Sequence, residues 1–223
     1  NSNKKSFLIN PFQNLFRITK RITQPTGLII GFLGPDGSGK STIINSIAKN
    51  HLPFRRLDYF HLKPFKSKSA NTIINSENPH ELPTYSILKS YIKLIFFVFQ
   101  YNIGWALNIF LLKRKSSLII FDRYFDDLLV DFKRYRFGGS IKLVNWMRHF
   151  IPKPDLYFIL TANADVIYKR KQEVDFDELK RQINDYRKLG KLSKYCNVDV
   201  NKSPDKIVNE VFTLIMEKLN GRY

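Results

Sequence analysis

Nine consecutive residues near the start of the chain have the types and spacing that hold a chain of phosphates. They follow the pattern G-x-x-x-x-G-K-S, with an apolar, β-prone run before them (28–33) and helically spaced isoleucines after them. Glycines let the backbone curl so that several N–H groups point at one phosphate chain, and the following helix adds its dipole. The alternative, a glycine-rich turn that binds nothing, is disfavoured by the intact strand and helix context. The predicted ATP-binding residues are Gly34, Pro35, Asp36, Gly37, Ser38, Gly39, Lys40, Ser41 and Thr42.

A second reactive group, Asp122-Arg123-Tyr124, directly follows an apolar run. We expect Lys40 to reach the β- and γ-phosphates and the Ser41 hydroxyl to bind Mg²⁺. Asp122 can hold the same ion directly or through water, or position the attacking group. Arg123 can grip an acceptor's phosphate through two parallel hydrogen bonds. The alternative is a surface turn with an Asp–Arg ion pair. The phosphate-binding motif at 34–42, known as a P-loop, favours the functional interpretation.

Alternating strands and helices must position these two groups. Such alternation is typical of a parallel sheet with helices on both faces, which binds ligands at the carboxyl ends of its strands. The predicted fold class is therefore α/β, a P-loop NTPase or nucleotide kinase-like three-layer fold with a doubly wound sheet, in a domain spanning 26–223. The predicted strands are 28–33, 56–62, 118–122, 155–160 and 196–200, and the predicted helices include 42–49, 165–189 and 204–219.

Other polar residues near these strand ends have two readings each. His61 and Lys63 either contact the acceptor or are ordinary residues at a strand end. One of the acids at 126, 127 and 131 either joins the acceptor site or balances nearby cations. The aromatic and basic run 132–137 either stacks on a base or touches an acidic polymer or lipid, or is a solvated helix end.

The charge balance favours an anionic partner. Lys and Arg number 37 against 19 Asp and Glu, which gives a net charge of +18. Nucleotide phosphate, nucleic acid and an acidic membrane surface all fit that charge, as does plain solvated lysine surface. Nucleic acid is disfavoured because the chain has no helix-turn-helix, zinc or RNA-binding signature. The single cysteine, Cys196, excludes a disulfide framework and favours a reducing compartment.

Two segments raise the question of lipid contact. Residues 1–25 form a basic segment in which 7–22 has roughly helical apolar spacing, consistent with a helix on a membrane, a helix on the domain or a linker. The stretch 94–112 has no charged residue, as a transmembrane helix would. Its interior amides, and the strand that directly follows it, favour a buried or membrane-touching helix instead.

The chain resembles the thymidylate kinase family of P-loop nucleotide kinases. The resemblance rests on 34–42, on Asp122-Arg123-Tyr124, and on 152–160 followed by Lys169-Arg170-Lys171. It implies that Asp36 helps hold the acceptor sugar, that Arg123 binds the acceptor phosphate with Tyr124 as a further substrate contact, and that Arg170 in the lid stabilises the transferring phosphoryl group. Gly37 occupies the place of an arginine found in some members, so the catalytic cation is expected from the lid. The resemblance also implies a homodimer.

A closer resemblance is to a thymidylate kinase-like branch found beside bacterial surface-polysaccharide genes. It rests on 60–64, 78–80, 121–131 and 134–139. The expected function is transfer of the γ-phosphate of MgATP to a nucleoside monophosphate resembling dTMP. The alternatives are a kinase of the same fold acting on a deoxynucleoside or a polysaccharide- or lipid-linked sugar, and a non-catalytic NTP-binding module at a membrane. The expected location is the cytoplasm, either free or at the inner face of the membrane.

Overall fold

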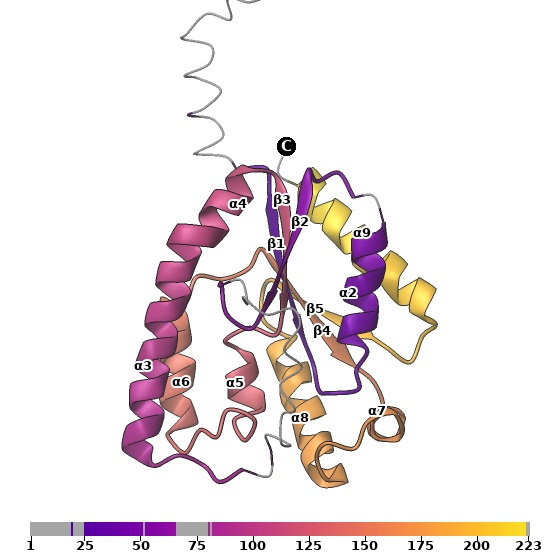
Figure 1. Ribbon diagram of the computed structural model, residues 1–223. Helices are drawn as coiled ribbons and strands as arrows, with labels where there is room; N and C mark the ends of the chain where they lie inside the picture. Colours follow the sequence, from indigo (N-terminus) through magenta and orange to yellow (C-terminus); the bar gives the residue numbers. More distant parts are fainter. Residues whose placement is uncertain (1–18, 20–24, 51, 66–79, 81, 222–223) are drawn as a thin grey trace, which may run out of the picture.

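A parallel five-stranded sheet lies at the centre of the molecule (Figure 1). The computed structural model describes Thr19 and residues 25–50, 52–65, 80 and 82–221. All four strand pairs are parallel, and the strand order is β2-β3-β1-β4-β5. The strands are β1 (Leu28–Leu33), β2 (Arg56–His61), β3 (Ser117–Asp122), β4 (Leu156–Thr161) and β5 (Tyr195–Asp199). The predicted α/β fold and all five predicted strands are confirmed, with bounds shifted by at most one residue.

The three central strands are buried on both faces, which explains their unbroken apolar sequences. Every residue of β1, β3 and β4 is buried. Alternate side chains point to opposite sides. Thus Ile30 and Phe32 join one core cluster, whereas Ile29 and Leu33 join the other. A strand whose two faces both pack in a core has no polar face, so its sequence is a continuous apolar run.

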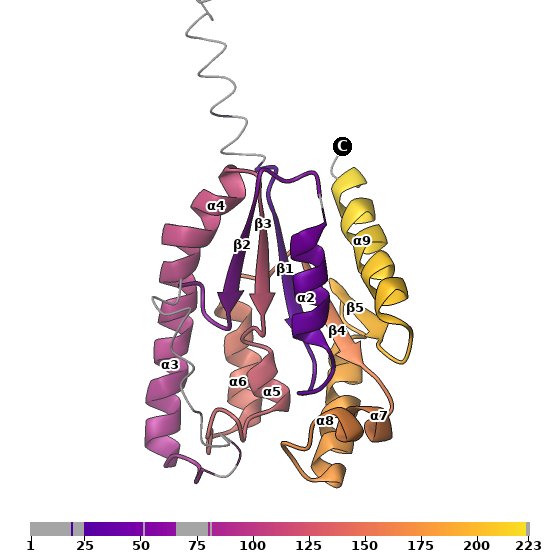
Figure 2. The same cartoon turned by 45° about the vertical axis from the view of Figure 1, so that its right-hand side comes forward.

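Helices cover both faces of the sheet (Figure 2). On one face lie α2 (Lys40–Lys49) and α9 (Pro204–Asn220), whose isoleucines and valines enter the first cluster. The other face is covered by α3 (Ile87–Gly104), the π-helix η1 (Trp105–Ile109), α4 (Phe110–Arg114), α5 (Asp127–Val130), α6 (Ile141–Met147) and the 3₁₀ turn η2 (Arg148–Phe150). Helices α7 (Ala164–Arg170) and α8 (Phe176–Leu189) lie toward the carboxyl ends of the strands (Figure 1).

This topology brings the two predicted motifs to one edge of the sheet. Strand β1 lies between β3 and β4, and Phe32 of β1 is in register with Asp122 of β3. The P-loop leaves the carboxyl end of β1, and Asp122-Arg123-Tyr124 leaves the carboxyl end of β3. In doubly wound sheets this is the edge at which ligands bind.

The two segments with possible lipid contact have different outcomes. The predicted basic segment at 1–25 lies almost wholly outside the described residues, so it and the boundary at 25/26 stay predictions. The apolar stretch 94–112 belongs to the continuous helical segment α3–η1–α4, which runs from Ile87 to Arg114. That segment is long and apolar enough to cross a membrane by length and composition, and only 28% of its most apolar window is buried. It is therefore not a typical core helix.

Candidate active site

The loop between β1 and α2 curls around a concave backbone surface. Gly34, Gly37 and Gly39 have φ angles of 146°, 80° and 86°, which ordinary L-residues rarely adopt. A Cβ atom at Gly34 would lie 2.4 Å from the carbonyl oxygen of Leu160, so a side chain there would clash with β4. Helix α2 begins at Lys40, directly after the loop, and its first N–H groups have no partner within the helix. The loop and helix together form a ready site for phosphate.

Lys40 is folded back over this loop. Its Nζ donates to the carbonyl oxygens of Gly34 (2.7 Å) and Pro35 (2.9 Å), and the residue is only 7% exposed. Burial, reinforced by the positive charge of Arg123 and opposed by Asp122, lowers the pKa of Lys40 from 10.5 to about 7. Apart from the Asp36 carboxylate, whose Oδ1 lies 3.9 Å from Nζ, its immediate partners are uncharged, so the ammonium still gains from an incoming anion. The environment therefore suits a phosphate ligand.

The two carboxylate oxygens of Asp122 differ in their contacts among the described residues. Its Oδ2 accepts a hydrogen bond from the Tyr59 hydroxyl at 3.1 Å, and the Nδ1 of His61 lies 4.0 Å from the same oxygen. Burial and this carboxylate both raise the pKa of Tyr59, so the hydroxyl remains a donor. Oδ1 is buried and has no hydrogen-bond partner among the described residues. A buried carboxylate oxygen without a donor suits a hard cation or one of its bound waters.

Arg123 occupies a strained backbone position and a highly charged environment. Its φ is 72°, and its N–H donates to the carbonyl of Phe32 at 3.0 Å. Such a conformation in a residue other than glycine persists only where surrounding contacts hold it. The guanidinium donates to Asp127 at 2.6 Å and to Asp36 of the P-loop. The side chain of Asp127 is fully buried and accepts further hydrogen bonds from the hydroxyls of Tyr135 and Tyr186.

This pairing keeps both groups charged. Burial alone would raise the pKa of Asp127, but Arg123 and the two tyrosine hydroxyls hold it below its ordinary value. Burial would likewise lower the pKa of Arg123, but Asp127 raises it well above its ordinary value. Asp127 is therefore the buried counter-ion that fixes the arginine side chain. The sequence left open whether one of the three acids at 126, 127 and 131 joins the site, and Asp127 does so indirectly.

Arg134 is the principal residue of the site that the sequence did not identify. Its guanidinium donates to Asp131 (3.1 Å) and Glu173 (2.9 Å) and also pairs with Asp36. It thus joins the P-loop to the segment after α7. Asp36, Glu173 and His80 have ligand atoms within 4.8 Å of one another, as in a metal site. Because arginines already pair with both carboxylates, we assign no metal to this cluster.

Most of the charged side chains described above line one cavity of about 630 Å³. P-loop residues Asp36 to Thr42, together with Asp122, Arg123 and His61, line its inner side. Arg170 and Lys171, at the end of α7, also line it, beside Glu173; the lid role of Arg170 stays a prediction. An apolar wall on the α9 side, also absent from the sequence prediction, is formed by Val200, Pro204 and Ile207. Gly34 and Pro35 do not line the cavity but hold Lys40.

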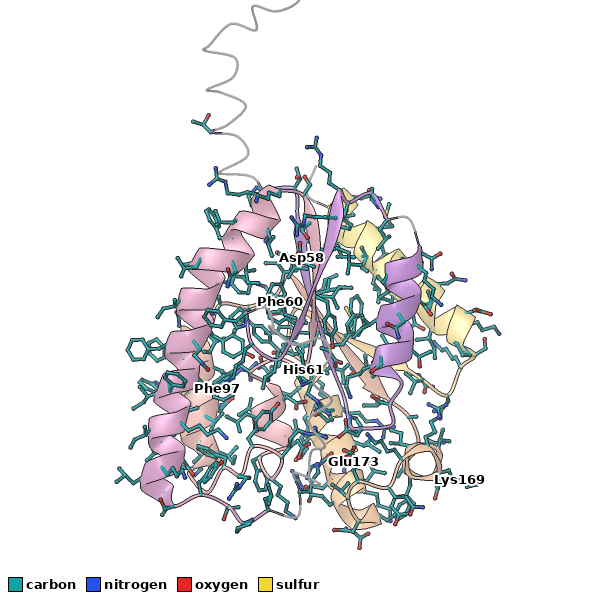
Figure 3. All side chains as sticks on the ribbon, viewed as in Figure 1. Asp58, Phe60, His61, Phe97, Lys169 and Glu173 are labelled. Carbon is teal, nitrogen blue, oxygen red and sulfur yellow. The ribbon has the colours of Figure 1, made fainter. Side chains whose placement is uncertain are left out.

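Two predicted acceptor-binding residues lie outside this cavity. Tyr124 is completely buried, packs edge-on against Tyr101 (4.8 Å) and donates its hydroxyl to the carbonyl of Pro152. It is a core residue, and its prediction as a substrate contact is wrong for this conformation. The Nζ of Lys63 lies 5.1 Å from the ring centre of Phe97, which projects inward from α3 (Figure 3). Lys63 is therefore directed toward α3, unlike His61.

Comparison with known proteins supports the fold. No protein-family model matches the chain. The thymidylate kinase of Candida albicans aligns over 88% of this chain and 93% of its own, with a TM-score of 0.58 and 21% identity. The thymidylate kinase of Ehrlichia chaffeensis aligns over 86% of this chain and 100% of its own, with a TM-score of 0.54 and 18% identity. The resemblance read from the sequence is thus confirmed at the level of the fold: the chain has the P-loop nucleotide kinase fold found in thymidylate kinases.

Proposed function

We propose that this protein is a phosphotransferase that moves the γ-phosphate of MgATP to a nucleoside monophosphate resembling dTMP. The observation that carries the proposal is the convergence of four elements on one cavity: the P-loop, Lys40, Asp122 and Arg123. A phosphoryl transfer needs a cradle for the donor phosphates, a cation, a metal-binding carboxylate and an anchor for the acceptor. Each of these four requirements has a residue here.

The donor site follows from the P-loop. Backbone N–H groups from Gly37 to Ser41 would hold the β- and γ-phosphates, and Lys40 would leave the carbonyls of Gly34 and Pro35 to meet them. An adjacent polyphosphate favours the charged form of Lys40, whose pKa burial otherwise lowers to about 7. The apolar wall beside α9 suits the flat face of a nucleobase. ATP is therefore the expected phosphoryl donor.

Ser41 and Asp122 would hold Mg²⁺. Both line the cavity, and the unpartnered Oδ1 of Asp122 fits a cation or its bound water. When bound by these two residues, Mg²⁺ would supply positive charge to offset that of the phosphate oxygens.

The acceptor site lies on the Arg123 side of the cavity. Arg123 would bind the acceptor phosphate, while Asp36 and His61 would contact the rest of the acceptor. An acceptor phosphate oxygen would then attack the γ-phosphorus as the bond to the bridging oxygen of ADP breaks. Arg170 and Lys171 would close over the equatorial oxygens from the lid side. Most of the catalysis would come from positioning and electrostatic stabilisation.

We expect the reaction to take place in the cytoplasm. The homodimer implied by the resemblance stays a prediction.

The test is ADP release from MgATP across a panel of acceptors. The panel holds dTMP, other nucleoside monophosphates, deoxynucleosides and phosphosugars. Lys40→Ala is expected to lower the rate by roughly 10²-fold or more, because it removes charge stabilisation at the transferring group. The matched control is Lys49→Ala, which removes an exposed lysine from the same helix, away from the cavity.

Each outcome of the panel has a defined meaning. Stimulation by dTMP that depends on Lys40 supports the proposal. Stimulation by a deoxynucleoside or a phosphosugar alone would keep the fold and donor but overturn the acceptor. ATP binding without turnover on any acceptor would favour the non-catalytic alternative. Full activity in Lys40→Ala would overturn the mechanism itself.

A further inference from the structure

The outer face of the helical segment α3–η1–α4 carries an unusual amount of exposed apolar surface. Leu88 is 71% exposed, and Phe99 and Leu107 are each 61% exposed. Exposed apolar surface of this extent marks an interaction site in soluble proteins. We define the outer face by its exposed apolar members, which are Ile87, Leu88, Ile92, Ile95, Phe96, Phe99, Ile103, Leu107, Phe110 and Leu111.

These residues lie opposite the side that packs on the sheet. The buried members of the helix, such as Leu94, Phe97 and Tyr101, recur at three- and four-residue spacing. The exposed members, such as Ile92, Ile95 and Phe99, recur with the same spacing about half a turn away. The helix is thus apolar on two opposite faces. One face makes the core, and the other needs a different apolar environment.

The apolar surface continues onto the neighbouring α6 and η2. Trp146 and Phe150 are 58% and 52% exposed, and their rings are 4.9 Å apart. The side chain of Asn102 on α3 donates to the carbonyl of Phe150 at 3.0 Å, which places this aromatic pair beside the outer face. Figure 1 shows α6 running next to α3. Exposed tryptophan and phenylalanine are typical of surfaces that enter the membrane interface.

The helix cannot cross a bilayer in this fold, because its inner face is fastened to the domain. Tyr101 donates its hydroxyl to the carbonyl of Leu62, and Asn108 donates to the carbonyl of Pro64 at 2.9 Å. Gly104 also meets Pro64 so closely that a Cβ atom there would lie 2.6 Å from the proline ring. The helix can therefore contact a membrane only along its outer face, with its inner face still packed on the domain.

The charged residues around the outer face are positive and favour an anionic partner. The sequence has no Asp or Glu in 82–121, 132–154 or 59–65, the segments that form and surround this face. The same segments supply exposed cations near both ends, including Lys89, Lys115 and Lys142. A second copy docked on the same face would bring cations together without carboxylates to pair them. An anionic bilayer supplies both hydrocarbon for the apolar side chains and phosphates for the cations.

We propose that the outer face docks on a bilayer of anionic phospholipids, with α3 lying in the plane of the interface. The cavity at the P-loop lies at the carboxyl ends of the strands, and no residue of α3, η1 or α4 lines it. A docked protein can therefore still admit nucleotide from solution. The inference stands on the exposed face alone and does not depend on the proposed function.

The test is sedimentation of the full chain with vesicles. We expect binding to vesicles of phosphatidylglycerol with phosphatidylcholine and little binding to phosphatidylcholine alone. The double variant Phe99→Gln/Leu107→Gln should bind anionic vesicles roughly tenfold more weakly or worse, because two large apolar side chains leave the lipid. The matched control Leu192→Gln/Met216→Gln changes two exposed apolar residues outside the face and should bind as the parent does.

Two further measurements make the outcome decisive. The fluorescence of Trp146 should shift to the blue on anionic vesicles, and Trp146→Phe should lose most of that shift. Unchanged binding of the Phe99→Gln/Leu107→Gln variant, with a normal thermal unfolding curve, would overturn the proposal and assign lipid binding to another segment. A lipid-free dimer that this variant converts to monomer would overturn it in favour of self-association.

Discussion

Arg123 and Asp36, 87 positions apart in the sequence, form an ion pair that joins the Asp-Arg-Tyr turn to the P-loop. Asp127 holds the same guanidinium from the other side. The arginine is only 4% exposed, yet it lines the cavity at the P-loop. An acceptor phosphate that binds Arg123 must therefore share it with, or displace, the carboxylate of Asp36. The proposed acceptor anchor and the proposed donor loop are thus linked through one side chain.

Arg123→Lys should lower kcat/KM by roughly 10²-fold while leaving ATP affinity nearly unchanged. A lysine keeps the charge but presents a single ammonium, which cannot bridge two carboxylates and a phosphate in the planar geometry of a guanidinium. The buried Asp127 would also lose part of its counter-ion, which should lower the melting temperature. Steady-state kinetics on the best acceptor, with nucleotide binding by calorimetry, measure both effects.

The control for Arg123→Lys is Arg187→Lys, on the exposed surface of α8. That variant keeps the same change of side chain away from the cavity and should behave as the parent. Parent-like turnover in Arg123→Lys would show that the acceptor does not need the bidentate arginine, and the acceptor site would have to be sought elsewhere.

Asp122→Asn should raise the Mg²⁺ concentration needed for half-maximal activity by about tenfold or more, without destabilising the fold. The substitution preserves shape, and the Oδ1 of Asp122 has no hydrogen-bond partner to lose among the described residues. An amide is a weaker ligand than a carboxylate for a hard cation. A magnesium titration of activity and a thermal unfolding curve check the two parts of this prediction.

Asp58→Asn provides the contrasting variant. Asp58 is a buried acid on the neighbouring strand β2, paired with Arg56 and with the hydroxyl of Ser117. Its loss should lower the melting temperature and leave the magnesium dependence alone. Equal magnesium curves for Asp122→Asn and the parent would remove Asp122 from the proposed metal site.

The strands and both motifs could be predicted because their signals are local. Strands β1, β3 and β4 are continuous apolar runs that end at turn residues, and the P-loop contains its own glycines. The parallel topology then follows from the alternation of strands and helices. Lys40, at the start of α2, and Asp122, at the end of β3, could therefore be predicted as site residues without a structure.

Side-chain directions beyond the strand ends could not be predicted. The positive φ of Arg123 turns the chain so that Tyr124 points back into the core, and the positive φ of Leu62 precedes Lys63 and its contact with Phe97. The residue types do not predict either turn, because leucine and arginine both disfavour a positive φ. The sequence also does not distinguish Arg134 from the other basic residues of 132–137. Its partners Asp36 and Glu173 come from distant segments of the chain.

Gly34→Ala should lower the free energy of unfolding by roughly 3 kcal/mol or more and abolish ATP binding. Its φ of 146° is unfavourable for alanine, and the added Cβ would meet the carbonyl of Leu160 at 2.4 Å. Gly39→Ala is the matched variant, with a φ of 86° but no described atom within 4 Å of the new Cβ. It should cost only about 1 kcal/mol. Chemical denaturation compares them, and equal losses would show that backbone strain, rather than the contact with β4, sets the cost.

Asp131 offers a test that depends on pH. It is buried and accepts hydrogen bonds from Arg134 (3.1 Å) and from the side-chain amide of Gln182 (3.3 Å), and the Nδ1 of His80 lies 3.6 Å away. Arg134 divides its guanidinium among three carboxylates, so it does not neutralise Asp131 alone. Burial and the charge of Asp127, with a smaller contribution from Glu178, raise the pKa of Asp131 from 3.8 to about 7, against the pull of Arg123.

The free energy of unfolding of the parent, relative to Asp131→Asn, should fall as the pH rises from about 4 to 7. Between 3.8 and about 7 the native state holds a proton on Asp131 that the unfolded chain has released, so raising the pH favours unfolding. The fall should reach up to about 4 kcal/mol and level off above pH 7, where both states are ionised. Urea denaturation at a series of pH values measures this difference. Asp177→Asn, at a side chain that is 92% exposed, should give a flat difference over the same range. A parent that gains stability relative to Asp131→Asn as the pH rises would mean that Arg134 holds Asp131 in its ionised form.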